Sequence, residues 1–192
     1  GKGGHAALPE DRVNPIIIAS KIITSLYDRF DKVKDHSSIF SVGVIKGGSA
    51  GNIIPDRVSL QGTFRAMNEK WRKEAHKIIE DICFSTAQEM NGKCVTDIKV
   101  GYPFLKNDVS YTKQCFYYAQ NFIDSERVIK IPKRMTAEDF SYYSHHVPAC
   151  FYRLGVGTSN KQRKHLHSAY FDIDESALKV SIGMMSWLAI NS

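Results

Sequence analysis

The sequence lacks the short motifs by which many enzymes are identified. Its 192 residues contain no HExxH pair of zinc-binding histidines, no GxSxG nucleophile elbow, no phosphate-binding P-loop and no GxGxxG dinucleotide fingerprint. The glycines of Gly155-Val156-Gly157 are too few for such a fingerprint, and we interpret them as a turn. Candidate functional residues must therefore come from several weaker patterns taken together.

The sequence also lacks long apolar runs and closely spaced cysteines. No run approaches the roughly 18 apolar residues of a membrane span, and no secretory signal opens the chain. From these features we expect a cytoplasmic protein with no membrane partner. Four cysteines stand among apolar neighbours without CxxC spacing, so we expect buried, free thiols at Cys83, Cys94, Cys115 and Cys150.

Acidic residues are fewer than basic ones, and the formal net charge is +6 with a pI near 9.1. The basic residues form short clusters along the chain, at 70–77, 130–134 and 161–164. Such clusters are usually solvated faces, so we expect no nucleic-acid partner. The same positive charge would equally suit anionic substrates that carry carboxylates.

Helix and strand patterns alternate in the N-terminal half. Asn14-Pro15 and Asn68 are typical helix starts, and apolar residues recur behind them at helical spacing. Between and after these helices, β-branched or alternating segments are typical of strands. The pattern predicts a helix, two strands, a second helix and a third strand, at residues 14–33, 39–45, 58–65, 68–91 and 94–102.

One more strand in front of these elements would complete the βαββαβ order of a ferredoxin-like fold. That strand would have to end at Gly1 to His5. In this topology the first strand is central, and its absence would leave an unpaired interior edge. We therefore expect the chain to be a piece of a longer protein.

From Pro103 onward the pattern is that of an α/β layer. It predicts helices at 109–123 and 137–145 and a mostly apolar strand at 149–156. A last helix, capped by Asp174, follows. We predict an α/β protein with two domains, residues 1–102 and 103–192.

Three side chains of the first predicted domain could take part in chemistry. His5 follows a glycine-rich turn, where it could donate a hydrogen bond to an oxyanion or be an ordinary loop histidine. Asn52 lies in a loop between strands, where an Asx-turn contact is the alternative to a functional role. Arg65 ends a strand on its polar side, where it could bind a carboxylate or face solvent.

Two further candidates lie in the second predicted domain. Glu138, beside Asp139, opens a short predicted helix, where the helix dipole alone would also favour a carboxylate. His165 and His167 flank Leu166, so both rings could reach one metal ion in an extended segment. The alternatives are that only one of the two histidines binds a metal, or that both are surface residues that bind none.

Five segments taken together resemble one family. They are GKGGHAALP (1–9), GG to NIIPD (47–56), GTFRA (62–66), MTAEDF (135–140) and LHS to FDIDE (166–175). In this order they resemble the aminoacylase/carboxypeptidase family of zinc amidohydrolases, in the branch of hippurate hydrolase, N-acetyl-diaminopimelate deacetylase and the auxin-conjugate hydrolases. The resemblance covers the whole chain, although Glu10 stands where the family often has histidine.

The resemblance implies a catalytic α/β domain with two divalent metal ions, interrupted by a ferredoxin-like lid through which two copies dimerise. The metal would be zinc, with manganese or cobalt as alternatives, and an activated water would attack the amide of an N-acyl amino acid or peptide-like substrate. His167 would be a metal ligand. His5, assisted by Asn52, would stabilise the oxyanion in the partner subunit's site. Arg65 would hold the substrate carboxylate, and Glu138 would lie near the metal or substrate.

The other parts of such a site do not occur in this sequence. In that family a Cys/His metal motif, a Glu-Glu pair with the general base and a further histidine lie upstream of the lid. Because a catalytic zinc needs about three protein ligands, we expect this chain alone to be inactive and to bind no catalytic metal. The alternative is a non-catalytic module for dimerisation or RNA binding. Strand 57–66 has only Phe64 of the aromatic pattern of RNA-binding strands, which argues against RNA.

Overall fold

The computed structural model describes residues 1–8, 10, 12–33, 38–157 and 166–191. These residues form two compact units. The first contains Gly1–Phe104 with Met135–Ala137, and the second contains Leu105–Arg134 and Glu138–Ser192. Within the described ranges, no helix is both long and apolar enough to cross a bilayer.

Both long helices of the first unit begin at asparagine caps, as the sequence predicts. α1 (Pro15–Asp31) follows Asn14, whose side chain accepts a first-turn N–H at 3.0 Å. α2 (Glu69–Glu89) follows Asn68, whose side chain does the same at 3.0 Å. Each cap satisfies an N–H group that the first helical turn leaves unpaired, which explains why the helices begin there.

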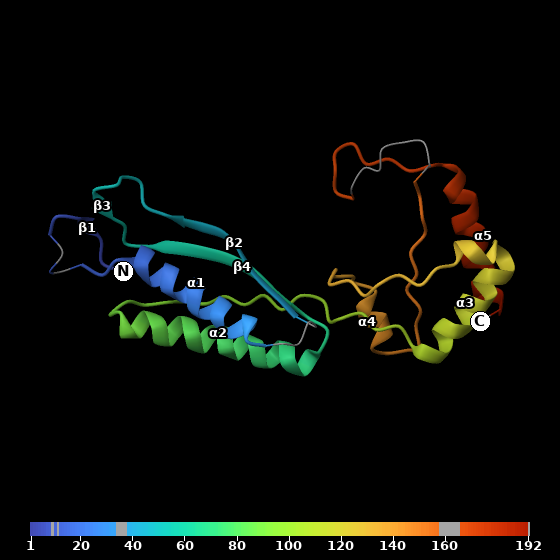
Figure 1. Ribbon diagram of the computed structural model, residues 1–192, viewed down its shortest axis with the longest axis horizontal. Helices are drawn as coiled ribbons and strands as arrows, with labels where there is room; N and C mark the ends of the chain where they lie inside the picture. Colours follow the sequence, from blue (N-terminus) through green and yellow to red (C-terminus); the bar gives the residue numbers. More distant parts are fainter. Residues whose placement is uncertain (9, 11, 34–37, 158–165, 192) are drawn as a thin grey trace. The chain divides into compact units, whose positions relative to one another are not determined.

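The first unit contains two small antiparallel sheets. β2 (Ser38–Gly47) pairs with β4 (Val58–Ala66), which confirms both strands predicted there. β1 (Gly4–His5) pairs with β3 (Ile53–Ile54). α1 and α2 lie side by side and cover one face of the β2–β4 sheet (Figure 1). The buried core between the two helices consists of Ile18, Ile22, Leu26, Cys83 and Ala87.

The strand predicted at 94–102 is not formed. Burial does alternate along part of it, since Cys94, Thr96 and Ile98 are half-buried and the residues between them are exposed. Alternation shows only that one side of a segment is covered, whereas a strand also needs a neighbour for its backbone N–H and C=O groups. No described segment supplies that neighbour. This part of the predicted βαββαβ order is therefore wrong for the described residues.

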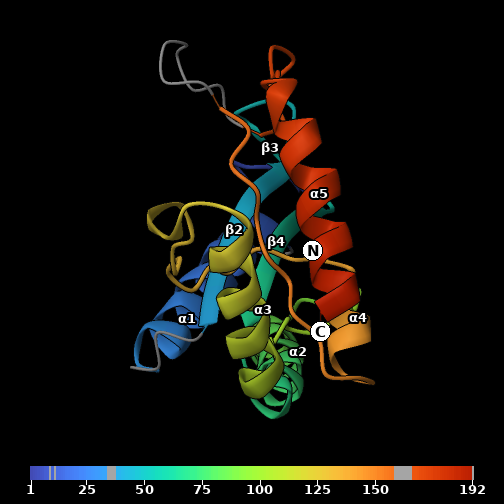
Figure 2. The same cartoon turned by 90° about the vertical axis from the view of Figure 1, so that its right-hand side faces the viewer.

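The second unit is built around two helices. α3 (Val109–Phe122) follows Asp108, whose carboxylate accepts a first-turn N–H at 2.8 Å. α5 (Ser176–Asn191) follows Asp174, whose carboxylate accepts an N–H at 3.0 Å. Both predicted helices are thus confirmed, and a short 3-10 helix, η2 (Ser125–Arg127), follows α3. The helices pack against each other (Figures 1 and 2) through Cys115, Met184 and Leu188.

The helix predicted at 137–145 is shorter than expected. Only α4 (Ser141–Ser144) is helical, and Glu138 and Asp139 precede it in a turn. Their carbonyls accept hydrogen bonds from the N–H groups three residues later, which is the pattern of successive turns. Glu138 therefore does not open a helix, and helix-dipole stabilisation does not explain this carboxylate.

The strand predicted at 149–156 is also not formed within the described residues. Its backbone is held instead by groups near the start of α3. The Asp108 N–H donates to the Ala149 carbonyl at 2.9 Å, and the Asn107 side chain bonds to the Phe151 backbone. Apolar composition predicted burial here, but burial does not by itself provide the parallel neighbours of a central strand.

Candidate functional site

His5 and Asn52 are brought together by the pairing of β1 with β3. His5 lies opposite Ile53 in the antiparallel register. One residue further on, the Ala6 N–H donates to the Asn52 carbonyl at 2.9 Å. Two candidate residues that are distant in sequence are therefore close neighbours, at the end of the first unit that carries β1 and β3 (Figure 1).

The glycine-rich segment before His5 is held by two charged side chains to which the sequence assigned no role. The Gly3 N–H donates to Asp56 Oδ1 at 2.8 Å, and Arg12 Nη1 donates to the Gly3 carbonyl at 2.7 Å. Gly4 has a φ of 143°, and a Cβ atom there would overlap the Arg12 guanidinium. Glycine is required at this position because the backbone is both left-handed and in close contact with Arg12.

The imidazole of His5 is exposed and its orientation is set locally. Its Nδ1 accepts the Ala7 N–H at 3.2 Å. In a neutral imidazole the nitrogen that accepts a hydrogen bond carries no proton, so the proton is on Nε2. His5 therefore offers an N–H donor, which is the group that a developing oxyanion needs.

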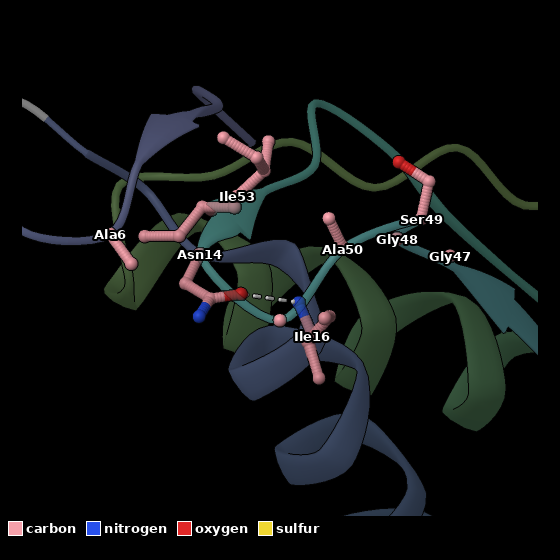
Figure 3. A pocket seen from close by; sticks show the side chains of 10 residues that line it. Ala6, Asn14, Ile16, Gly47, Gly48, Ser49, Ala50 and Ile53 are labelled. Carbon is pink, nitrogen blue, oxygen red and sulfur yellow. Dashed lines mark hydrogen bonds between the residues drawn. The ribbon is translucent and has the colours of Figure 1, made fainter.

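An open hollow of about 500 Å³ lies beside this segment, between the start of α1 and the loop of residues 47–51 (Figure 3). Ala6 and Ile53 form part of its wall. The side-chain oxygen of Asn14 also faces it, but that oxygen already accepts the Ile16 N–H (dashed line in Figure 3). None of the described residues that line the hollow has a titratable side chain, so they offer no group for acid–base chemistry.

Arg65 is not brought to His5 and Asn52. It is exposed near the end of β4, opposite Ile39 of β2. β4 begins at Val58, on the side of β3, and at a rise of roughly 3.3 Å per residue the Val58 and Arg65 Cα atoms are about 23 Å apart. The first unit thus presents its candidate groups at opposite ends of the β2–β4 sheet.

In the second unit Glu138 forms an ion pair with Arg153. Glu138 Oε1 and Arg153 Nη2 are 3.6 Å apart, and the two side chains are 34% and 30% exposed. This partial burial leaves the pair accessible to a ligand. Arg153 lies within an apolar segment of the sequence, and no sequence signal connects it to Glu138, because ion pairs between distant residues have no fixed spacing.

His167 is exposed and has a φ of 69°. A non-glycine residue in the left-handed region is uncommon, and such residues concentrate at functional sites. His165, the other half of the predicted histidine pair, lies outside the described residues. Across the described ranges, no three His, Cys, Asp or Glu side chains are grouped so that they could hold a metal ion.

Comparison with known proteins gives a family match over part of the chain and relatives along nearly all of it. Residues 1–91 match the family described as "Peptidase dimerisation domain" (M20_dimer). The chain is 32% identical over 200 residues to an IAA-amino acid hydrolase (ILR1-like 4) of Arabidopsis thaliana, covering 98% of the chain and 44% of that relative. It is 35% identical over 184 residues to an N-acetyldiaminopimelate deacetylase of Leuconostoc citreum, covering 93% of the chain and 46% of that relative.

Solved structures have a similar fold. A dinuclear metal-binding peptidase of the M20 family from Bacillus subtilis matches with a TM-score of 0.69 at 22% identity, over 93% of this chain and 46% of that one. The aminopeptidase PepT of Bacillus cereus matches with a TM-score of 0.75 at 20% identity, over 97% and 48%. These likenesses confirm the predicted fold class. The chain spans about half the length of the relatives and structures that it matches.

Proposed function

We propose that the chain, whose residues 1–91 match the M20 peptidase dimerisation family, is the lid and the C-terminal catalytic segment of a metal-dependent amidohydrolase. Residues 1–102 are the lid, and residues 103–192 return to the catalytic domain. The substrate is an N-acyl amino acid or a related conjugate, and its amide bond is hydrolysed. The curated relatives support this substrate class, since they are named for an amino-acid conjugate and an N-acetyl compound.

The observation that carries the proposal is the pairing that places His5 beside Asn52. With its Nδ1 occupied by the Ala7 N–H, His5 has the Nε2–H free to donate to the oxygen of an amide under attack. Asn52 uses its carbonyl to hold Ala6, which leaves its exposed side-chain amide to assist the same oxygen. Arg65 binds the carboxylate of the substrate, and Glu138 lies near the reacting centre with Arg153 beside it.

The described residues do not fit a complete metal site. His167 is the candidate ligand, and no group of three ligands is formed within the described ranges. A similar fold occurs in a dinuclear metal-binding peptidase, which supports two divalent ions in the longer protein, with zinc expected and manganese or cobalt as alternatives. When bound, these ions would supply an activated water. The remaining ligands come from outside this chain, so the chain alone is inactive.

The separation of Arg65 from His5 and Asn52 supports an active site that is shared by two copies of the lid. An N-acyl amino acid is much shorter than the roughly 23 Å between Val58 and Arg65 along β4, so one such substrate does not reach both groups on one lid. In a homodimer, each active site takes the Arg65 of its own chain and the His5 and Asn52 of the partner chain. The match to a dimerisation domain supports this arrangement.

Mixed dimers of the longer protein test the arrangement. The variants His5→Ala and Arg65→Ala are each expected to be inactive as homodimers. A heterodimer of the two has one site with both groups intact and one site with neither. We expect this heterodimer to recover about half the wild-type activity, because both substitutions then affect one active site and the other active site is intact. Absence of any recovery in a verified heterodimer would mean that both groups serve the site of one chain, and would contradict the shared-site arrangement.

The alternative is a module without chemistry, for dimerisation or RNA binding. The isolated chain, incubated with N-acetyl amino acids and zinc, manganese or cobalt, is expected to release no free amino acid. Release that depends on the metal would show that the chain needs no further ligands. A salt-dependent gel shift with single-stranded RNA would support the RNA alternative, and we expect none.

A further inference from the structure

Each compact unit contains one pair of neighbouring thiols. In the first unit Cys83 of α2 is part of the buried core and Cys94 packs against that core. In the second unit Cys115 of α3 is buried and Cys150 packs against its cluster. Within each pair the two cysteines therefore belong to one packed cluster, and the second thiol is near enough to contribute to the raised pKa of the first. All four are free, as the sequence predicts; Cys83 and Cys115 are buried, and Cys94 and Cys150 are half-buried.

The two pairs are built in the same way. One cysteine of each pair lies on a long helix, and the other lies on a segment that has no ladder hydrogen bonds in the described residues. Cys83 and Cys115, on the helices, are 7% and 6% exposed, whereas Cys94 and Cys150 are half-buried. Disulfide formation within either pair breaks no sheet among the described residues, and in the second unit the hydrogen bonds of Ala149 and Phe151 hold Cys150 near α3. Cys94 and Cys150 are also the more accessible thiols of their pairs.

We propose that each pair is a dithiol site that a small-molecule disulfide, such as glutathione disulfide, closes to an intramolecular disulfide. The expected bonds are Cys83–Cys94 in the first unit and Cys115–Cys150 in the second. This inference does not depend on the hydrolytic function, because it uses no residue of the candidate active site.

The chemistry is two successive thiol–disulfide exchanges. The Cys94 thiolate attacks one sulfur of glutathione disulfide; the bond between the two glutathione sulfurs breaks, and one glutathione leaves and takes up a proton. The Cys83 thiol then loses its proton and attacks the Cys94 sulfur. The second glutathione leaves, so two protein thiols are oxidised and one glutathione disulfide is reduced to two thiols. Cys150 and Cys115 follow the same sequence.

The order of attack follows from the surroundings of the thiols. Burial, together with the nearby Cys94, raises the pKa of Cys83 to about 12. Burial and the nearby Cys150 raise the pKa of Cys115 to about 11. Because the thiolate is the nucleophile, both helical cysteines react poorly with a reagent from solution. They become effective only when the attacked sulfur is already held next to them, which favours closure within a pair.

Peptide mapping tests the pairing directly. The folded chain is incubated with glutathione disulfide, free thiols are blocked with N-ethylmaleimide, and the digest is analysed by mass spectrometry without reduction. We expect two cross-linked peptide pairs, containing Cys83 with Cys94 and Cys115 with Cys150, and no retained glutathione. Dithiothreitol should restore all four thiols. Retained glutathione on Cys94 or Cys150, other pairings, or no reaction of the folded chain would each overturn the proposal.

Two serine variants serve as matched controls for each other. Cys94→Ser should abolish the first cross-link, leave Cys83 unmodified and leave the second cross-link intact. Cys150→Ser should do the reverse. Both positions are half-buried, so serine is a mild change, and circular dichroism before oxidation verifies folding. Modification of Cys83 by glutathione in the folded Cys94→Ser variant would show that burial does not protect it and would contradict the proposed order of attack.

Discussion

Asn107 pairs with the backbone of Phe151 through both ends of its side-chain amide. Its Nδ2 donates to the Phe151 carbonyl at 2.9 Å, and its Oδ1 accepts the Phe151 N–H at 2.8 Å. The two residues are 44 positions apart, and the amide replaces the neighbour that a strand would have provided. The side chain thereby holds the segment that carries Cys150 and Arg153 against the start of α3.

Asn107→Ala is therefore expected to destabilise the second unit. Two partly buried hydrogen bonds are lost, and at about 0.5–1.5 kcal/mol each the free energy of unfolding should fall by about 1–3 kcal/mol. Urea denaturation monitored by circular dichroism measures the change. Asn191→Ala is the matched control, since its exposed amide donates to the carbonyl of Trp187, one turn earlier in the same helix. Equal effects of the two substitutions would contradict the special role of Asn107.

Gly4→Ala should destabilise the first unit and displace His5. The φ of 143° is unfavourable for any residue with a Cβ atom, and the new methyl group would push against the Arg12 guanidinium. We expect a loss of about 1–2 kcal/mol in the free energy of unfolding. Gly101→Ala is the control, because a Cβ there meets no atom within 4 Å. NMR shifts of the His5 ring should change in the first variant and remain unchanged in the second.

Stability should decrease on mild acidification because of His76. Burial lowers the pKa of His76 below 6.5; Arg72 lowers it further, and Glu80 and Glu69 partly oppose this. The unfolded chain then binds a proton more readily than the folded chain. The contribution of neutral His76 to the free energy of unfolding is therefore fully present above about pH 6.5 and is lost as the pH falls through the lowered pKa. The urea midpoint should be lower near pH 5 than near pH 7.5. In His76→Gln the difference in urea midpoint between the two pH values should be smaller. If it is unchanged, groups other than His76 cause the pH dependence.

The ion pair between Glu138 and Arg153 should contribute little to stability. Both side chains are about one-third exposed and their charged atoms are 3.6 Å apart, so water and salt screen the attraction. A double-mutant cycle with Glu138→Gln and Arg153→Gln is expected to give a coupling energy of about 0–1 kcal/mol that decreases with salt. A much larger coupling would mean that the pair is a structural anchor and that Glu138 is not available to a ligand.

Helix positions in this protein are predictable because their signals are local. The caps at Asn14, Asn68 and Asp174 precede helices whose apolar residues recur at helical spacing, and every one of these helices forms. The segments 94–102 and 149–156 have apolar patterns of the kind that strands have, yet neither forms a strand within the described residues. A strand requires a hydrogen-bonded neighbour, and the pattern of one segment carries no information about its neighbour.

In the candidate site, too, local motifs identify the residues, whereas their arrangement depends on strand pairing. The motifs identified His5, Asn52, Arg65, Glu138 and His167 as candidates, and their functional roles stay predictions. The sequence assigned roles to the first three but did not place them relative to one another. The structure separates them, because His5 and Asn52 meet where β1 pairs with β3 and Arg65 lies near the far end of β4.

The sequence by itself determined the α/β class, the helices with their caps and the family resemblance, because these depend on residues that are close together along the chain. Only the tertiary structure decided which distant groups meet: His5 with Asn52, Gly3 with Asp56, Glu138 with Arg153, and each cysteine with its partner. The physical reason is that these contacts follow from how strands and helices pack, and packing depends on the whole chain at once.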